Sequence, residues 1–543
     1  MSKTEKKDVK KVKKEPKKSR KKEEKKEEDA SVKELVDALK LQTSKIQENA
    51  EALENYPLRA PFSYALIVRD KGTGEVSYIV DEIPLNNQEQ DAFMKLKNIL
   101  EANLQAPHEQ ESPIESFRRQ LPSIMEKSRG LTKDLSNVGL RKIVHFLEGE
   151  IAGFGKIDSL LADAYIEDIS CNGVNIPIYL WHRKYENIKT NLLFKEEDEL
   201  DDFVMKIVHK AGKHVSIAYP TVDATLPGKH RLAVYYKKEV TPLGTSFTIR
   251  KFREDPYTVV DLINNDTMSI EVAAYLWLLI ENKLSSIIIG ATGAGKTTAL
   301  NAVAGMIHPE QKIISVEEVA EVNLLRENWV STIARSGFGI ESSGEISLYE
   351  LIRNSVRHRP DWIIVGEVRG EEAYVLFQTL ATGHGGLCTM HAEDADTAIK
   401  RLTQPPMNIP GTIIPLMNCV VSVKHVKAPV LVNYGKAASK RKFDKVSEVI
   451  SSGTIHDVFV WDNAAETYRA DLSNSYLFRK ISEKWSLPID YVIEEFDKRK
   501  EVLQYLIEKN IRSHRSIATF LSKFYGNPEL TYNEILESGG NIS

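Results

Sequence analysis

Residues 286–303 read SIIIGATGAGKTTALNAV, and this stretch decides the fold. An apolar run is followed by the spacing G-x4-G-K-T, the pattern of a β-strand, a glycine-rich loop and a helix. Such a loop turns successive backbone N–H groups toward phosphate oxygens, and the helix N-terminus adds its positive dipole end. We expect Lys296 to reach the terminal phosphates of a nucleotide and the Thr297 hydroxyl to ligate Mg²⁺. The residues expected to bind the nucleotide are Gly290, Ala291, Thr292, Gly293, Ala294, Gly295, Lys296, Thr297 and Thr298.

Two further apolar runs, at 312–316 and 362–365, end in carboxylates. These are Glu317, Glu318 and Glu321 after the first run and Glu367 after the second. At the carboxyl edge of a parallel sheet, a carboxylate lies where it can position the attacking water or touch the Mg²⁺ shell. Taken alone, three glutamates after a strand are more often a solvated loop, and Glu367 can be a solvated strand end. Beside the phosphate-binding loop we expect a catalytic role for all four, and a place near the metal for Glu367.

A third element is TGHGGLCTMH at residues 382–391. We expect its histidines, His384 and His391, to lie at one edge of the sheet and to hydrogen-bond the γ-phosphate. Without neighbouring motifs, two histidines seven residues apart are more often structural. A zinc site is disfavoured, because neither an i,i+4 spacing nor a thiolate partner is evident.

The rest of the pattern divides the chain into three parts. Residues 1–30 are rich in Lys and Glu and lack aromatic residues, so we expect disorder, with attraction to anionic lipid as the alternative. Residues 31–255 form the expected N-terminal domain, in two α/β parts of about 31–160 and 161–250. Residues 256–543 alternate helices with short apolar strands, which indicates a mostly parallel sheet with crossover helices, followed by C-terminal helices.

Several elements of the N-terminal domain can be predicted individually. Order is expected to begin with a helix near Val32. The next expected elements are a hairpin at 62–80 and helices at 87–104, 114–128 and 136–161. Short strands and turns follow from about 166 to 250.

Composition excludes several classes of protein. The 543 residues carry a net charge of −4, and residues 1–30 hold 14 Lys or Arg and 8 Asp or Glu. That segment therefore carries +6 and the remaining chain −10, a charge that does not favour nucleic acid by bulk attraction. Three cysteines without a C-x-x-C spacing exclude a disulfide framework and a four-cysteine zinc site within one chain.

The cysteine content fits a reducing, cytosolic compartment. No apolar run approaches the roughly 18–20 residues that a membrane span needs, and the N-terminus lacks the apolar region of a signal peptide. We therefore expect a cytoplasmic protein whose association with the membrane is indirect, through partners.

In their order along the chain, the phosphate-binding loop, the acidic segment, GEVR at 366–369 and TGHGG…TMH at 382–391 resemble the type II/IV secretion ATPase superfamily. EDISCNG at 167–173 and IPIYLWHRKY at 176–185 are similar to its archaeal branch, above all to archaellum motor ATPases and archaeal type IV pilus assembly ATPases. The resemblance implies a RecA-like C-terminal domain that binds ATP and Mg²⁺, a mobile N-terminal domain, and a homo-hexamer. The four-cysteine zinc insertion of many bacterial secretion ATPases is absent, which disfavours the bacterial type II branch.

The resemblance also implies roles for single residues. Lys296 and Thr297 match the Walker A pair, Glu317, Glu318 and Glu321 the acidic box, Glu367 the Walker B acid, and His384 and His391 the histidine box. Glu318 stands where Asp is usual. Arg231 and Arg250 resemble the N-terminal-domain arginines that contact the phosphates. A planar guanidinium can donate to several phosphate oxygens and so stabilise the negative charge that develops on them during hydrolysis. Without the family, Arg250 is more simply a solvated hinge residue.

The implied function is a hexameric ATP-hydrolysing motor that assembles or rotates an archaeal type IV pilus-like filament. Its implied partners are a polytopic membrane platform protein and cytosolic accessory proteins at the cytoplasmic face of the cell membrane. Adhesive pilus assembly and secretion are alternatives within this class. A nucleic-acid translocase is an alternative from another class, disfavoured because the net charge is negative and no basic stripe with interleaved aromatics occurs. The complete set of motif residues disfavours a nucleotide-gated scaffold with an idle site.

Overall fold

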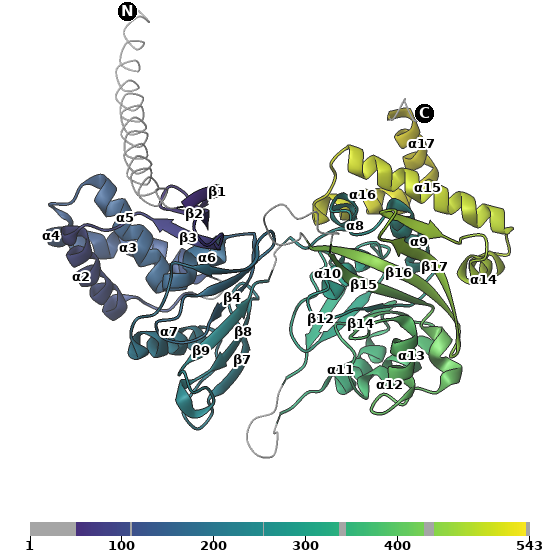
Figure 1. Cartoon of the computed structure of the whole chain (residues 1–543), viewed down its shortest axis with the longest axis horizontal. Helices are drawn as coiled ribbons and strands as arrows, with labels where there is room; N and C mark the ends of the chain where they lie inside the picture. The colour runs from purple at the N-terminus through teal and green to yellow at the C-terminus, as the bar shows by residue number, and fades with distance from the viewer. Residues whose placement is uncertain (1–49, 109–110, 253–254, 336–343, 428–438, 539–543) are drawn as a thin grey trace, which may run out of the picture. The chain divides into compact units, whose positions relative to one another are not determined.

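The computed structural model describes residues 50–108, 111–252, 255–335, 344–427 and 439–538. The expected tail and the helix expected near Val32 lie outside these residues. The chain divides into two compact units, Met1–Phe252 and Arg253–Ser543, and each is described by itself. Each unit is built on a nine-stranded sheet covered by helices (Figure 1).

The sheet of the first unit has the order β1-β2-β3-β6-β5-β4-β9-β8-β7. Its strands are β1 (Ala50–Arg59), β2 (Ser63–Asp70), β3 (Val76–Glu82), β4 (Ile166–Cys171), β5 (Tyr179–His182), β6 (Glu186–Thr190), β7 (Thr221–Thr225), β8 (Arg231–Tyr235) and β9 (Ser246–Arg250). β2 and β3 pair antiparallel, which confirms the expected hairpin. A parallel pairing of β3 with β6 joins the segments on either side of residue 160 into one sheet.

Helices of the first unit pack around a separate apolar cluster that includes Phe93, Leu96, Phe117 and Leu147. They are α2 (Asn87–Asn103), α3 (Pro113–Lys127), α4 (Arg129–Thr132) and α5 (Asn137–Leu147). The helices α6 (Asp158–Ala162) and α7 (Glu197–Lys210) pack instead against the sheet through residues such as Leu160 and Val204. Short helical turns lie at Glu148–Ala152, Gly155–Ile157 and Lys237–Glu239. The single helix expected over 136–161 was wrong. It breaks after Leu147 into a π-helical turn and a 3₁₀ turn, because glycines in this stretch weaken a continuous helix.

The sheet of the second unit has the order β12-β11-β13-β14-β10-β15-β16-β17-β18. Its strands are β10 (Ser286–Ile289), β11 (Ile313–Glu317), β12 (Trp329–Ile333), β13 (Trp362–Val365), β14 (Gly385–Met390), β15 (Cys419–Lys427), β16 (Ser439–Ser451), β17 (Thr454–Asp462) and β18 (Thr467–Ala470). Strands from β12 to β15 in this order are parallel. β16, β17 and β18 extend the sheet by antiparallel pairing.

Helices cover both faces of this second sheet. One face packs against α9, α10 and the C-terminal helices around residues such as Trp277, Leu300 and Phe478, and the other packs against α11, α12 and α13 around Ile363 and Phe377. The helices are α8 (Val259–Asn264), α9 (Ile270–Glu281), α10 (Lys296–Ala304), α11 (Leu348–Ser355), α12 (Glu372–Ala381), α13 (Ala395–Thr403), α14 (Tyr476–Trp485), α15 (Ile489–Glu508), α16 (His514–Gly526) and α17 (Pro528–Ser538), with 3₁₀ turns at Val356–His358 and Gly411–Leu416. Within the described residues, no helix is both long and apolar enough to cross a bilayer.

A buried carboxylate fixes the C-terminal helices to the sheet. Glu448 on β16 is fully buried and accepts hydrogen bonds from the Tyr275 hydroxyl at 2.6 Å and from the N–H groups of Tyr476 at 2.7 Å and Leu477 at 3.2 Å, in the first turn of α14. His456 Nδ1 lies 3.2 Å from Glu448, and its Nε2 lies 3.1 Å from Asp471. Burial lowers the pKa of His456, but the hydrogen bonds to these two carboxylates outweigh it and raise the pKa above its ordinary value.

The raised pKa of His456 predicts that the stability of the second unit depends on pH. A folded-state pKa above the unfolded value of about 6.5 means that the stabilisation is present below that pH and is lost as the pH rises through the folded pKa. We expect His456→Gln to lower the unfolding midpoint at pH 6 more than at pH 8.5, measured by thermal unfolding. His358→Gln, at an exposed position of the same unit, is the control. An equal effect of His456→Gln at both pH values would contradict the assignment.

Candidate nucleotide-binding site

The glycine-rich loop leaves the carboxyl end of β10, whose four residues are buried. A β-carbon at Gly290 would overlap the carbonyl oxygen of Val423 on the neighbouring strand, so the position accepts only glycine. Gly295 has a φ of 97° and forms the N-terminal cap of α10. Thr297 and Thr298 then lie in the first turn of that helix, with its free N–H groups directed at the loop. The backbone therefore has the strand–loop–helix geometry that the sequence predicts.

The close approach at Gly290 carries a prediction about stability. We expect Gly290→Ala to destabilise the second unit by about 2–4 kcal/mol, because either the loop or β15 must move to relieve the overlap. Chemical or thermal unfolding measures the effect. Gly526→Ala is the matched control, since a β-carbon there meets nothing within 4 Å. Equal midpoints for the two variants would contradict the close packing.

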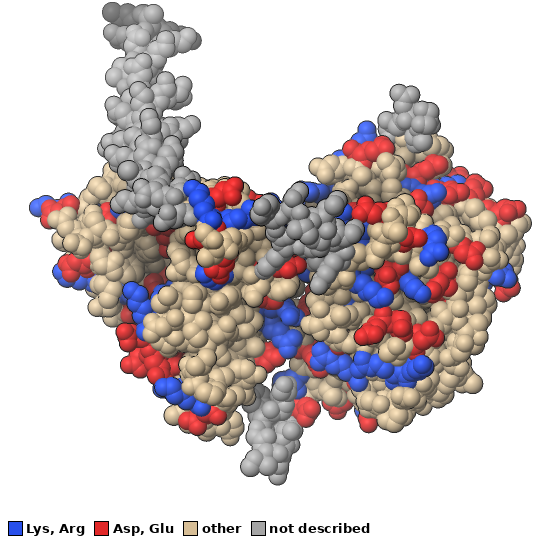
Figure 2. All heavy atoms as spheres, viewed as in Figure 1, with Lys and Arg blue, Asp and Glu red and all other residues tan. Residues whose placement is uncertain are grey.

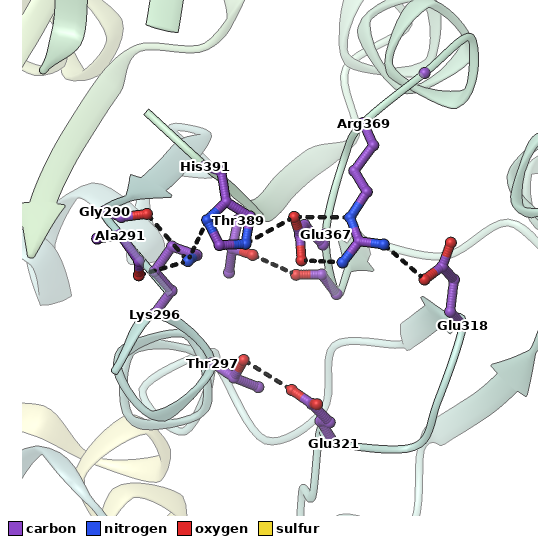
Figure 3. Close-up of polar contacts among 12 residues, drawn as sticks. Gly290, Ala291, Lys296, Thr297, Glu318, Glu321, Glu367, Arg369, Thr389 and His391 are labelled. Carbon is purple, nitrogen blue, oxygen red and sulfur yellow. Dashed lines mark hydrogen bonds and ion pairs between the residues drawn. The ribbon is translucent and has the colours of Figure 1, made fainter. Parts of the chain in front are cut away.

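A chain of polar contacts links the loop to the segment after β13 (Figure 3). Lys296 Nζ donates to the carbonyl oxygens of Gly290 at 3.1 Å and Ala291 at 3.0 Å, and lies 3.3 Å from His391 Nδ1. On the other side of the ring, His391 Nε2 lies 3.2 Å from Glu367 Oε1. Because an ammonium only donates and a carboxylate only accepts, the neutral imidazole accepts at Nδ1 and donates from Nε2. His391 thus connects the phosphate-binding lysine to Glu367.

The electrostatics of this chain favour a neutral imidazole beside a charged carboxylate. Burial lowers the pKa of His391, and the positive charge of Lys296 lowers it further. Burial alone would raise the pKa of Glu367, but the hydrogen bonds from Arg369 and the neighbouring cations hold that pKa below its ordinary value. At neutral pH Glu367 is therefore an ionised acceptor, suited to orient or deprotonate a water molecule.

The acidic segment after β11 gives its carboxylates different contacts. Glu321 Oε2 accepts a hydrogen bond from the Thr297 hydroxyl at 2.9 Å (Figure 3). Glu317, only 2% exposed, accepts at Oε1 from the N–H groups of Glu321 at 2.9 Å and Val322 at 2.7 Å. Asn301 on α10 donates to the Glu321 carbonyl at 3.2 Å. Glu317 therefore shapes the segment, and Glu321 is the carboxylate that reaches the loop.

Arg369 connects two of the expected catalytic carboxylates. Its guanidinium donates to both Glu367 oxygens, at 2.8 and 2.9 Å, and to Glu318 Oε2 at 3.1 Å. Thr389 on β14 donates to the Gly366 carbonyl at 2.7 Å, which fixes the backbone just before Glu367. Neither Arg369 nor Thr389 was assigned a role from the sequence. The available signal for Arg369 was its position two residues after a carboxylate at a strand end.

The oxygen ligands of this site fit Mg²⁺. The Thr297 hydroxyl and the Glu321 carboxylate already lie in contact. The charged carboxylate of Glu367 lies near Lys296, with the ring of His391 between them (Figure 3). Mg²⁺ prefers such hard oxygen ligands and binds through one or two side chains together with substrate phosphates. Thr297 and Glu367 are the residues predicted from the sequence for this metal, and Glu321 joins them by its contact with Thr297.

His384 and His391 lie at opposite ends of β14. The strand spans Gly385–Met390, so His384 precedes it and His391 follows it. His384 Nδ1 lies 2.9 Å from the Thr382 hydroxyl and 3.2 Å from the Thr379 carbonyl oxygen. A strand of this length separates its ends by about 20 Å, so the expectation of one shared sheet edge was wrong. Of these two histidines, His391 is the one that contacts the phosphate-binding loop.

Arg231 and Arg250 belong to the first unit and lie side by side there. They are register partners on β8 and β9, so both side chains project from the same face of the sheet. Arg231 Nη2 lies 2.7 Å from Asp223 Oδ2, and Arg250 Nε lies 3.3 Å from Asp168 Oδ1. Burial raises the pKa of Asp168, although Arg250 acts against it. The nucleotide role that the resemblance implies for this arginine pair stays a prediction.

Comparisons with known proteins identify a family and several similar proteins. A family described as "Type II/IV secretion system protein" matches residues 152–448. An uncharacterized protein of Methanocaldococcus jannaschii is 31% identical over 503 residues, covering 87% of this chain and 88% of that protein. The conjugal transfer protein TrbB of Rhizobium radiobacter is 31% identical over 203 residues, 36% of this chain and 60% of TrbB. Among solved structures, the ATPase DotB of Legionella pneumophila has 16% identity and a TM-score of 0.38, covering 69% of this chain and 92% of DotB.

The chain belongs to the type II/IV secretion system protein family, because the family match spans more than half of its length. The relative from M. jannaschii, aligned along most of both chains, agrees with the archaeal branch of that family. The second unit has the α/β fold expected from the sequence, a RecA-like P-loop domain in which β14 separates the loop-bearing β10 from β13.

Proposed function

We propose that the chain is an ATP-hydrolysing motor subunit that powers assembly of an archaeal type IV pilus-like filament. The observation that carries the proposal is the contact chain from Lys296 through His391 to Glu367. It brings the phosphate-binding lysine and an ionised carboxylate together at the carboxyl edge of one parallel sheet, where P-loop enzymes bind and cleave nucleotides. Membership of the type II/IV secretion system family supports the link from hydrolysis to a filament or secretion machine.

Each residue of the site has a distinct task in this proposal. The loop N–H groups and Lys296 bind the β- and γ-phosphates, and Thr297 with Glu321 and Glu367 would hold Mg²⁺, which neutralises phosphate charge when bound. Glu367 orients the attacking water, because its carboxylate is ionised and held by Arg369. His391 donates a hydrogen bond to Glu367. Its other ring nitrogen contacts Lys296, so a movement of Lys296 on binding phosphate would change the position of the imidazole.

The remaining features of the proposal come from the family resemblance. The subunit would act as a homo-hexamer with a polytopic membrane platform protein and cytosolic accessory proteins, at the cytoplasmic face of the cell membrane. Arg231 and Arg250 would contact the phosphates and help to complete the site when the two units approach each other. The filament is an archaellum or an adhesive pilus, and the alternative is that the same ATPase drives protein secretion.

A nucleic-acid translocase is the competing function, favoured by the similarity to a conjugal transfer protein. On the face seen in Figure 2, acidic and basic side chains are interspersed over each unit. The residues outside 1–30 carry a net charge of −10, which disfavours binding to a nucleic-acid backbone by bulk attraction. Turnover that is stimulated by DNA and falls steeply with salt would favour the translocase.

Assembly-dependent turnover tests the motor. Phosphate release per chain should rise with protein concentration over the range in which sedimentation velocity shows ring formation with a non-hydrolysable ATP analogue. The physical reason is that closure of one unit on another completes the site. Turnover per chain that stays constant across that range, with no response to lipid or to a co-purified membrane protein, would contradict the motor proposal.

A further inference from the structure

The hairpin of β15 and β16 extends beyond the end of the strand that carries the phosphate-binding loop. Ile289, the last residue of β10, is the register partner of Ser422, whereas β15 continues to Lys427. Beyond that point β15 continues its pairing with β16, where His425 is the partner of Arg441. Figure 1 shows this pair of strands running past α10. The outer part of the hairpin therefore flanks the loop.

Three residues of the hairpin contact the loop at its three glycines. The Val423 carbonyl oxygen packs against Gly290. His425 Nε2 lies 2.9 Å from the Gly293 carbonyl oxygen, and because a carbonyl only accepts, this ring nitrogen is the donor. Arg441 Cδ lies 3.4 Å, and its Nε 4.0 Å, from the point that a β-carbon on Gly295 would occupy. The hairpin therefore approaches the loop at Gly290, Gly293 and Gly295.

The hairpin and the catalytic carboxylates lie on opposite sides of the loop. In the sheet, β10 stands between β14 and β15. His391 follows β14 and Glu367 follows β13, so both are on one side, and Arg441 on β16 is on the other. A nucleotide whose terminal phosphate points toward Glu367 therefore extends its nucleoside end toward the hairpin.

We propose that Arg441 binds the nucleoside-side phosphate of ATP and ADP, and so sets the affinity for both nucleotides. The aliphatic part of the side chain lies against Gly295, where no side chain separates it from the start of α10. A guanidinium at that point adds a fixed positive charge and planar donors beside the helix N-terminus, which suits a phosphate oxygen. The α-phosphate is present in both nucleotides, so Arg441 acts on binding, whereas Glu367 acts on cleavage. The inference rests on the proposed nucleotide function of the loop.

Direct binding of fluorescent ADP and of a fluorescent non-hydrolysable ATP analogue, each with Mg²⁺, tests the inference in the full chain. Arg441→Gln keeps the Cβ and Cγ methylenes and a planar polar end but removes the charge, whereas Arg441→Lys also keeps the Cδ methylene that packs on Gly295. We expect Arg441→Gln to weaken both nucleotides by the same factor, about tenfold, and Arg441→Lys to recover part of the affinity. Lys440→Ala is the control. Its side chain belongs to the opposite face of β16 and pairs with Asp266 at 3.2 Å, so both affinities should stay at the wild-type value.

The possible outcomes separate the inference from the proposed function. If the wild-type chain binds both nucleotides but Arg441→Gln leaves the dissociation constant for ADP unchanged, the inference is overturned and the nucleotide site stands. A loss confined to the ATP analogue would also overturn it, because it would place Arg441 at the terminal phosphate. Wild-type chain that binds neither nucleotide would overturn the proposed function and this inference with it.

Discussion

Lys296→Ala is expected to weaken the binding of ATP and ADP by at least about 100-fold and to abolish hydrolysis. In the structure the ammonium group donates to the carbonyls of Gly290 and Ala291 and contacts His391, which holds it over the loop. Lys296 is buried, and removing a buried charged donor from its partner costs about 2–5 kcal/mol. Equilibrium binding of a fluorescent nucleotide measures the loss, and circular dichroism checks that the fold is retained.

A second lysine of the same unit provides the control for this variant. Lys283 pairs with Asp361 at 2.7 Å, just before β13 and so at the amino edge of the sheet, away from the loop. Lys283→Ala should leave nucleotide affinity within about twofold of wild type, because a distant, partly exposed ion pair is worth little. Similar losses for both lysine variants would mean that Lys296 acts on the fold and has no direct contact with phosphate.

Glu367→Gln is expected to bind ATP normally and to hydrolyse it at least about 100-fold more slowly. An amide keeps the size of the side chain but cannot take a proton from water or carry the charge that Arg369 and His391 now face. Positioned acid–base groups contribute about 10²–10⁴-fold to rate, and a variant that keeps binding but loses turnover has lost a contribution made in the transition state. Single-turnover hydrolysis and nucleotide binding, measured on the same preparation, separate the two effects.

The neighbouring carboxylates sharpen the assignment of Glu367. Glu318 is about half exposed and, among the described residues, pairs with Arg369, so Glu318→Gln should reduce turnover much less. Glu317→Gln should also bind ATP and hydrolyse it poorly, but through the acidic segment that Glu317 holds by two backbone hydrogen bonds. If Glu318→Gln lost as much activity as Glu367→Gln, the roles of the two residues would have to be exchanged.

Local patterns predicted the centre of the second unit well. The apolar run before Gly290 became β10, and the run at 362–365 became β13 with the bounds expected. Both are central strands of a parallel sheet, where continuous hydrophobicity is a strong signal. β1 gave no such signal, because AEALENYPLR is not a typical strand sequence and is held in place by its pairing with β2.

The histidine error has a physical explanation in packing between distant segments. A glycine-rich turn was expected around His384 and a short strand at 386–390, whereas the strand already begins at Gly385 because larger residues lie against both glycines. A β-carbon at Gly385 would lie 2.7 Å from the Trp362 ring, and one at Gly386 would overlap Leu380. The segment therefore extends as a strand and carries His384 and His391 to opposite edges.

Residues contributed by distant strands could not be predicted from local sequence. Arg441 lies more than a hundred residues after the loop, on a strand that no motif marks, and it reaches Gly295 only because β16 pairs with β15. Arg369 and Glu318 likewise meet through the register of β11 and β13. The glycine-rich loop between β10 and α10 was predictable because its pattern lies in consecutive residues.

The central claim is that this loop and Glu367 form a site that hydrolyses ATP. The most direct test is the release of inorganic phosphate from ATP by purified wild-type chain, at concentrations that favour assembly, with Mg²⁺ and with a chelator in its place. The account predicts release that requires Mg²⁺ and is reduced at least about 100-fold by Glu367→Gln. Phosphate release that Glu367→Gln leaves unchanged, or no release by the assembled wild-type protein with Mg²⁺, would contradict it.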